Sequence, residues 1–289
     1  MTAPRILVIG ATGTVGRQVV LGLTNQGSRV RAMTRNPEAS DLPPHVDVVQ
    51  GDLTVPDTLD ACLDGIDSVF LVWTAPPAAT DAALARIAKR AQHIVFLSAP
   101  LKTPHPFFQQ PNPARTLMLH IEELIEQSGL EWTFLRPGMF AANSVGFWGP
   151  QIRVGDTVRW PYLSAPTAPI DERDIAAVAV RALTEQGHDR REYVLTGPQS
   201  LTQHEQIATI GRVIGRALKI EEISRDEARR AWAAVMPAAV ADMLMDAWAA
   251  ALGQPAYMTS GVQEITGTPP RTFADWTTDN AAAFVGPGS

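Results

Sequence analysis

The sequence is poor in several features that mark particular classes of protein. Its 289 residues include one cysteine, Cys62, which excludes an intrachain disulfide and a cysteine-based zinc site. Apolar runs such as Val69–Trp73 fall far short of the roughly 18 residues typical of a membrane span. The 24 basic and 30 acidic residues give a net charge of -6, and no cluster of five basic residues occurs. We therefore expect neither a nucleic-acid nor a membrane partner.

The motifs of several enzyme classes are also missing. There is no paired-histidine spacing such as His-Glu-x-x-His, so no metal site is predicted, and there is no Gly-x-Ser-x-Gly elbow of a serine hydrolase. The segment Met1–Arg5 leads directly into a strand-like stretch without the regions of a secretory signal. We expect a cytoplasmic protein, and 45% hydrophobic against 19% charged residues is an ordinary globular composition.

From Arg5 to about Arg136, short β-branched runs alternate with amphipathic helical patterns. Strands are expected at Ile6–Ile9, Val30–Met33, Val46–Val49, Ser68–Val72, His93–Leu97 and Trp132–Leu135, and helices at Val15–Gln26, Ala78–Ala91 and Pro113–Gln127. Because each parallel strand pair needs a crossover, this alternation predicts a parallel sheet covered on both faces. The expected fold class is α/β, with a doubly wound Rossmann sheet.

The pattern loosens after Phe140. It resumes as expected helices at Asp171–Leu183, Thr202–Arg216 and most of 226–252, and as expected strands at Glu192–Leu195 and Leu218–Ile223. Composition does not shift sharply, so the boundary is approximate. We predict a Rossmann domain over 1–150. Residues 151–289 are predicted to form a smaller, mostly helical part that caps the strand ends, with some segments returning to the sheet.

Three glycines stand where the first apolar strand turns into a helix, in Ile6-Leu-Val-Ile-Gly10-Ala-Thr-Gly13-Thr-Val-Gly16-Arg17. A helix N-terminus offers backbone N–H groups to a pyrophosphate, and a Cβ at these positions would obstruct the turn, the ligand or helix–sheet packing. A tight turn without a ligand is the alternative. The position in the first β-α unit favours a dinucleotide site, made by Gly10, Thr12, Gly13, Thr14, Val15 and Gly16.

The end of the second strand indicates which dinucleotide is bound. A site for NAD usually carries Asp or Glu about 20 residues beyond the glycines, on the ribose 2′-hydroxyl. Here the strand ends in Thr34-Arg-Asn-Pro37, without a carboxylate. Arg35 can pair with a 2′-phosphate and Arg17 can add a second charge, although both could be solvated surface arginines. The sequence thus favours NADP(H) over NAD(H).

Later strand ends supply the remaining cofactor contacts. Asp52 follows the third strand, where it could hold the adenine or cap a helix starting near Val55. Trp73 follows the fourth strand and is either a core residue or a wall of the cofactor site. The contacts expected from these strand ends are Asp52, Leu53, Trp73, Thr74, Ser98 and Pro137.

Several blocks of the chain carry a family resemblance. They are Gly10-Ala-Thr-Gly-Thr-Val-Gly16, Thr34-Arg-Asn-Pro37, Gly51-Asp-Leu53, Ser128-Gly-Leu-Glu-Trp-Thr-Phe-Leu-Arg-Pro137 and Thr268-Pro-Pro-Arg-Thr-Phe273. From about Ile6 to Phe284 the chain resembles the NmrA-like branch of the atypical short-chain dehydrogenases/reductases. The resemblance implies a Rossmann domain, a small C-terminal substrate-side domain and NADP(H) or NAD(H). Members include quinone reductases, reductases of specialised metabolism and catalytically silent redox sensors.

Catalytic members of the wider superfamily use a serine, a tyrosine and a lysine four residues after the tyrosine. Ser98 matches the serine, or else is a strand-end hydroxyl that bonds loop backbone. Counting back from Ser128, the tyrosine and lysine positions hold Ala114 and Met118, which cannot transfer a proton. The nearest ionisable groups are Arg115, His120 and Glu123, of which His120 is expected at the surface or an interface.

Hydride transfer remains possible without the tyrosine and the lysine, because the nicotinamide supplies the hydride and a quinone-like or cationic imine-like acceptor needs no strong acid. We predict an NADPH-dependent reductase of such a small organic substrate. The alternative is a non-enzymatic NADP(H) sensor that acts through a protein partner. A homo-oligomer is compatible with the Ala-rich helical region. An apolar cleft is expected above the nicotinamide, unless its aromatic members are core, and its lining residues would be Phe107, Met139, Phe140, Asn143, Phe147 and Trp148.

Overall fold

Seven parallel strands form the main sheet of the computed structural model, which describes residues 4–100 and 102–286. Their order is β3-β2-β1-β4-β5-β6-β9, and every neighbouring pair is parallel. The strands are β1 (Arg5–Ile9), β2 (Arg29–Thr34), β3 (Asp47–Gln50), β4 (Ser68–Val72), β5 (His93–Leu97), β6 (Glu131–Pro137) and β9 (Arg191–Leu195). This confirms the doubly wound α/β prediction. The order reverses between β1 and β4, where such sheets bind ligands beyond their carboxyl ends.

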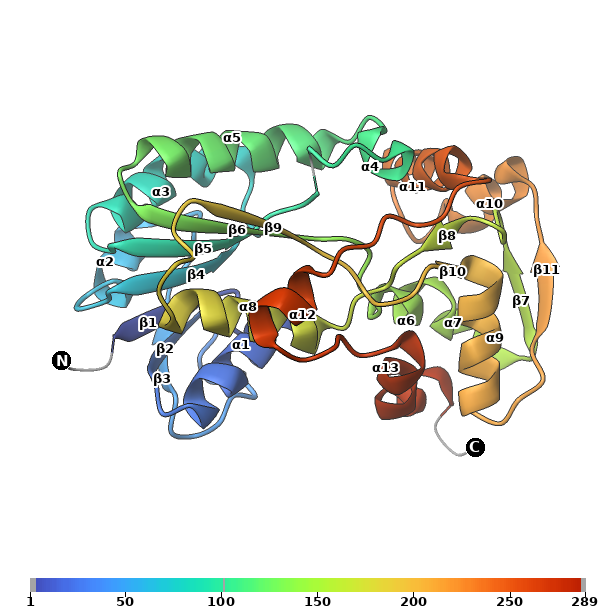
Figure 1. Ribbon diagram of the computed structural model, residues 1–289, viewed down its shortest axis with the longest axis horizontal. Coiled ribbons are helices and arrows are strands. Elements are labelled where there is room, and N and C mark those ends of the chain that lie inside the picture. Colours follow the sequence, from blue (N-terminus) through green and yellow to red (C-terminus); the bar gives the residue numbers. More distant parts are fainter. Residues whose placement is uncertain (1–3, 101, 287–289) are drawn as a thin grey trace.

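Helices cover both faces of this sheet (Figure 1). One face carries α2 (Leu59–Cys62), α3 (Thr80–Ala88) and α5 (Pro113–Gln127), and the other carries α1 (Thr14–Asn25), α8 (Glu172–Thr184) and α12 (Gly261–Thr266). Side chains alternate along β1: Ile6 and Val8 pack in the core with α1 and α8, whereas Leu7 and Ile9 pack in the core with α2, α3 and α5. Cys62 is buried in the second of these cores, and burial raises the pKa of its thiol.

The rest of the chain builds a third core beside the carboxyl ends of the strands. Its helices are α4 (Pro106–Gln109), α6 (Asn143–Phe147), α7 (Gly149–Val154), α9 (Gln203–Val213), α10 (Arg225–Trp232), α11 (Ala238–Ala251) and α13 (Phe273–Asp279). Two small sheets pair β7 (Thr157–Trp160) with β11 (Lys219–Glu222) and β8 (Pro166–Thr167) with β10 (Leu201–Thr202). Short 3-10 helices are η1 (Pro56–Thr58), η2 (Pro77–Ala79) and η3 (Ala281–Phe284). The centre of this core is aromatic, with contacts among Phe147, Trp148, Trp160, Trp232 and Trp248.

The helical stretch expected over 226–252 is two helices, α10 and α11. Pro237 is the N-cap of α11, with an extended backbone at ψ 140°. A proline has no N–H to donate and disfavours helix in the residue before it, so α10 cannot continue through it.

Like α12, two further segments beyond residue 150 lie on the main sheet. Strand β9 pairs with β6 at the edge, and α8 packs along α1. The C-terminal region thus contributes both to the sheet and to the structure beside the carboxyl ends of its strands (Figure 1).

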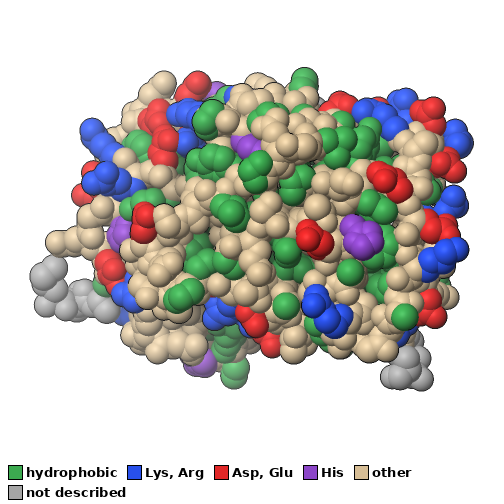
Figure 2. Space-filling view, turned by 45° about the vertical axis from the view of Figure 1, so that its right-hand side comes forward, with side chains coloured by type: hydrophobic (Ala, Val, Ile, Leu, Met, Phe, Trp, Pro, Cys, Tyr) green, Lys and Arg blue, Asp and Glu red, His purple; other side chains and the backbone are tan. Residues whose placement is uncertain are grey.

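The surface carries mixed charge. On the face drawn in Figure 2, Lys and Arg side chains are interspersed with Asp and Glu, and hydrophobic side chains lie in scattered groups between them. Within residues 4–100 and 102–286, no helix has the length and apolar character needed to cross a membrane.

Candidate cofactor and substrate sites

The turn between β1 and α1 has the geometry of an anion cradle. Gly10 has φ +85°, a left-handed conformation that favours glycine. The Gly13 N–H donates to the Gly10 carbonyl at 3.0 Å, which closes the turn. Gly13 is the N-cap of α1, and no side chain among the described residues caps that end, so the first N–H groups of this helix face outward with the positive end of its dipole.

Gly16 allows the closest backbone approach in this turn. A Cβ placed on it would lie 2.1 Å from the Gly10 carbonyl oxygen and 3.2 Å from the Ala11 Cα. Both atoms belong to the backbone, so a side chain at position 16 would force the whole turn to move. The third glycine is therefore required by the packing of α1 against the loop.

A cavity of about 680 Å³ opens beside this turn, at the carboxyl ends of β1 to β4. That volume lies within the range of small-molecule sites, roughly 300–1,000 Å³. The candidate residues that line it are Gly10, Thr12, Gly13, Arg35, Asp52, Leu53 and Thr74. The glycine cradle, the outward N–H groups and Arg35 together fit the phosphates of a nicotinamide dinucleotide.

The other cofactor candidates lie around the cavity and do not line it. Thr14, Val15, Gly16 and Arg17 form the first turn of α1, and Val15 and Gly16 are buried. Arg17 pairs with Asp41 at 3.1 Å. The remaining candidates are Trp73, a buried residue whose indole N–H donates to the Ala75 carbonyl at 2.7 Å, and Pro137, which is buried at the end of β6.

Arg35 projects into the cavity from a fixed backbone. Its carbonyl accepts a hydrogen bond from the Gln50 side chain at 3.2 Å, whereas nothing in the described part of the chain pairs with its guanidinium. Opposite, the Asp52 carboxylate accepts the N–H and the hydroxyl of Thr54, both at 2.8 Å, and these bonds lower the pKa of Asp52. The expectation that Asp52 caps a helix near Val55 is wrong. The Asp52 carboxylate bonds Thr54 instead, and no side chain among the described residues caps η1. Thr54 was not among the candidate residues identified from the sequence.

Ser98 directly follows β5 and lies in a buried network of charges. Its hydroxyl donates to the Glu122 Oε1 at 2.6 Å, and the Arg136 guanidinium holds both oxygens of Glu122 at 3.0 and 2.7 Å. Arg136 also pairs with Glu192 on β9. Although burial lowers the pKa of Arg136, the two carboxylates raise it overall. Ser98 is thus linked through Glu122 to α5 and β6. The Ser98 hydroxyl donates to this carboxylate and not to loop backbone, as the alternative interpretation had expected.

The two α5 positions that the sequence comparison with the wider superfamily led us to expect for tyrosine and lysine hold Ala114 and Met118, neither of which donates a proton. Ala114 is exposed in the first turn of α5, and Met118 packs against the core that α2 and α3 share. His120 is exposed and lies 3.4 Å from the Asp81 carboxylate, in agreement with its expected surface location.

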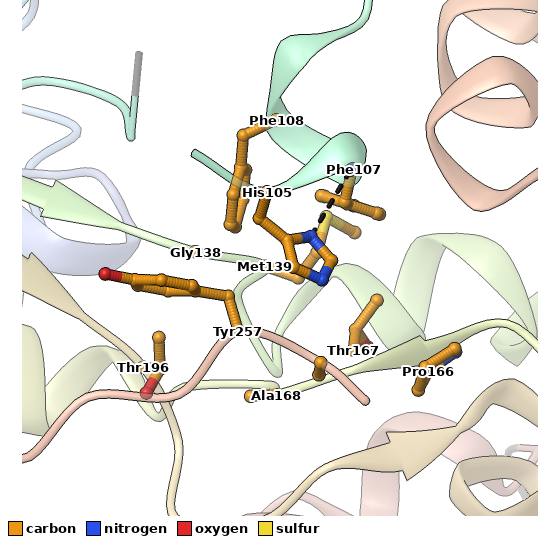
Figure 3. Close-up of a pocket in the computed structure, with 11 residues that line it drawn as sticks. His105, Phe107, Phe108, Gly138, Met139, Pro166, Thr167, Ala168, Thr196 and Tyr257 are labelled. Carbon is orange, nitrogen blue, oxygen red and sulfur yellow. Dashed lines mark hydrogen bonds between the residues drawn. The ribbon is translucent and has the colours of Figure 1, made fainter. Parts of the chain in front are cut away.

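A second cavity lies above the end of β6 (Figure 3). Aromatic rings surround it, and the Phe107 and Phe108 rings contact each other edge to face with centroids 5.0 Å apart. His105 is buried with its Nε2 3.1 Å from the Pro255 carbonyl, which assigns the proton to Nε2, and its Nδ1 accepts the Phe107 N–H. Both nitrogens of His105 are therefore engaged in holding the loop.

Tyr257 brings a hydroxyl group without a hydrogen-bond partner among the described residues to the lining of this cavity. Figure 3 shows Phe108 reaching toward the Tyr257 ring, while the Tyr257 hydroxyl points away from His105. Across residues 4–100 and 102–286, no group forms a hydrogen bond with this hydroxyl. Thr196 nearby is occupied, since its hydroxyl oxygen accepts the Thr259 N–H at 3.0 Å.

A third cavity of about 150 Å³ lies between the loop after β5 and helices α4, α5 and α11. Phe107, Phe108 and Met139 line both this cavity and the one around Tyr257. The two cavities are therefore adjacent, separated by these three side chains, and together they are called the cleft below.

The six residues expected to line a substrate cleft fall into two groups. Phe107 and Met139 line the cleft. Phe140 forms a bridge with Ile170, Asn143 is exposed at the start of α6, and Phe147 and Trp148 pack in the aromatic core. Lining residues that sequence reasoning missed include His105, Thr196, Tyr257, Met243 and Leu244, which no local spacing connects. In the described part of the chain, no cluster of three or more His, Cys, Asp or Glu side chains could hold a metal ion.

The sequence profile of a family described as NAD(P)H-binding matches residues 10–186. This chain belongs to the NAD(P)H-binding family. The match begins at the glycine turn and extends through α8, so it covers the cavity built on β1 to β4. It agrees with the resemblance to the NmrA-like, atypical short-chain reductases.

Named relatives of this NAD(P)H-binding protein match nearly its whole length. A (4-alkanoyl-5-oxo-2,5-dihydrofuran-3-yl)methyl phosphate reductase of Streptomyces griseus is 41% identical over 97% of this chain and 99% of its own. An NAD(P)H azoreductase of Xenophilus azovorans is 35% identical over 96% and 99%. The Citrobacter sp. triphenylmethane reductase complexed with NADP(H) has a TM-score of 0.80 at 21% identity, over 96% and 99%, and shares the fold. The chain is an NAD(P)H-dependent oxidoreductase.

Proposed function

We propose that this oxidoreductase uses NADPH to reduce a small conjugated organic acceptor, quinone-like or imine-like, without a Tyr/Lys dyad. The observation that carries the proposal is the placement of two sites at the carboxyl ends of strands of the same parallel sheet. The cavity with the glycine turn and Arg35 lies at the ends of β1 to β4, and the aromatic cleft lies at the ends of β5 and β6. Relatives that reduce an unsaturated lactone phosphate and azo compounds, by their names, support an acceptor with conjugated double bonds.

The chain's own residues bind the cofactor and shield the reaction. The N–H groups at the start of α1 and the Arg35 guanidinium hold phosphates. The cavity around Tyr257 has a volume of about 10 Å³, room for about one water molecule, so an acceptor must displace Phe107 and Phe108 to enter. When bound, NADPH supplies the hydride, and water supplies the balancing proton. A conjugated acceptor suits this site because Ala114 and Met118 offer no acid.

Arg35 tests the preference for NADPH. Arg35→Asp should weaken NADPH binding about 10- to 100-fold, because a charge-assisted contact with the 2′-phosphate is replaced by repulsion. NADH has no 2′-phosphate, so its affinity should stay the same or improve. Titrating both dinucleotides by fluorescence gives the two Kd values. An unchanged Kd for NADPH would refute the proposed specificity.

Tyr257 tests the location of the acceptor. Its unpaired hydroxyl can donate a hydrogen bond to an acceptor oxygen or nitrogen, and such a bond is worth about 1 kcal/mol or more. Tyr257→Phe should therefore lower kcat/KM for a quinone about 10-fold and leave the Kd of NADPH unchanged. Tyr193→Phe is the matched control, since the Tyr193 hydroxyl lies 2.8 Å from the His188 Nδ1 and lines none of these cavities. Equal kcat/KM values for the two variants would place the acceptor elsewhere.

A further inference from the structure

Arg115 is a cation at the wall of an otherwise uncharged cavity. It stands in the first turn of α5, half-buried, and lines the 150 Å³ cavity between α4, α5 and α11. Among the described residues that line this cavity, it is the one with a charge. The others are Ala99, Pro100, Phe107, Phe108, Gln110, Asn112, Met139, Met243, Leu244 and Ala247.

The residues that the structure describes supply no counterion for this arginine. In the parts of the chain that the structure describes, its guanidinium takes part in no ion pair and no hydrogen bond. The positions three and four residues away on α5, such as Met118 and Leu119, bear no carboxylate. By contrast, Arg181 on α8 pairs with Glu185 four residues later.

The two polar neighbours in this cavity wall are already engaged. The Gln110 amide donates to the Pro106 carbonyl at 3.0 Å, and the Asn112 side-chain oxygen caps α5 by accepting the Ala114 N–H at 2.8 Å. Arg115 is left with its planar set of donors free at the edge of apolar surface. A guanidinium in that position matches the two oxygens of a carboxylate, sulfonate or phosphate.

The apolar part of the cavity limits what accompanies the anion. Met243, Leu244 and Ala247 on α11 face Phe107 and Phe108 across it. A cavity of about 150 Å³ can hold an apolar group of roughly the size of benzene. Met139 lines both halves of the cleft, so a molecule bound here extends toward the end of β6 and the Tyr257 half.

We propose that the acceptor is an amphipathic anion, whose carboxylate, sulfonate or phosphate group pairs with Arg115 while its apolar portion fills the cavity beside α11. This rests on the proposed reductase function, because it assumes that the cleft is where the acceptor binds. It makes Arg115 a specificity residue that selects charged over neutral acceptors.

The test uses two acceptors that differ by one anionic group, 1,4-naphthoquinone and 1,4-naphthoquinone-2-sulfonate. Their Kd values are measured on the full-length protein saturated with NADP+, and their kcat/KM values with NADPH. The wild type should prefer the sulfonate about 10-fold or more in Kd. Arg115→Gln should weaken the sulfonate about 10- to 100-fold, change the parent quinone less than about threefold, and leave the Kd of NADPH unchanged.

Arg29→Gln is the matched control. Arg29 is exposed at the start of β2, the neighbour of the edge strand β3, and also has no ion pair in the described chain. It should keep the wild-type preference, and Arg115→Lys should keep part of it. Equal Kd values for the two quinones in the wild type, or an Arg115→Gln protein with the wild-type preference, would overturn the inference. If neither quinone is reduced while the Kd pattern holds, the reductase proposal fails for quinones and the anion site stands.

Discussion

Replacing Glu122 with leucine should lower the free energy of unfolding by about 3–5 kcal/mol. Arg136 and Glu122 are each only 2% exposed, and Glu122 accepts bonds from Arg136 and from Ser98. Leucine fills similar space, yet it leaves the buried Ser98 hydroxyl without its acceptor and leaves the buried Arg136 guanidinium with only the partly exposed Glu192 as a partner. The cost of breaking the buried pair between Arg136 and Glu122 exceeds any gain from the added apolar surface. Urea unfolding followed by tryptophan fluorescence measures the difference.

Two further variants separate the charge effect from packing. Glu192→Gln removes the outer, partly exposed partner of Arg136 and should cost less than about 1 kcal/mol, as is usual for a solvated pair. The double variant Glu122→Leu/Arg136→Met removes both buried charges and should recover most of the loss. If Glu192→Gln lowers the free energy of unfolding as much as Glu122→Leu does, the burial of Glu122 is not what stabilises this network.

The main sheet could be predicted because its signals are local. Strands β4 and β5 are near-continuous apolar runs, since a parallel strand between two helical layers is buried on both faces. The pattern predicted their bounds to the residue. The break between α10 and α11 was missed because the apolar pattern continues through it, although Pro237 is the signal that marks it.

The cofactor cavity was largely predictable and the substrate cleft was not. Gly10, Gly13 and Arg35 lie within one β-α-β unit, where chain order dictates their proximity. The cleft instead joins His105 to Tyr257, 152 positions apart, through packing of α4 against the segment after α11. Aromatic composition alone could not tell that Phe107 lines the cleft while Trp148 is core.

Polar candidates were harder to place than glycines. Ser98 matches a catalytic position in the sequence, yet its hydroxyl bonds Glu122, a residue whose burial no local pattern indicated. Arg17 and Arg35 look alike as free cations, but Arg17 pairs with Asp41 and Arg35 lines the cavity. The contacts of these polar side chains depend on partners that lie far apart in the sequence, and the spacing of motifs gives no information about those partners.

Gly16→Ala should weaken NADPH binding at least about 100-fold, about 2.7 kcal/mol. The added Cβ would stand 2.1 Å from the Gly10 carbonyl oxygen, so the turn must shift by more than a side chain could absorb. Gly13 depends on that same carbonyl for its 3.0 Å bond, so the shift also displaces the N-cap of α1 and the N–H groups that we propose hold the phosphates. Fluorescence titration with NADPH measures the loss. The control is Gly146→Ala on α6, where a Cβ would meet nothing within 4 Å. Since Gly146 is far from the turn in sequence and lines none of the three cavities, its Kd should match the wild type. A Gly16→Ala protein that binds NADPH as tightly as this control would show that the phosphates do not rest on this turn.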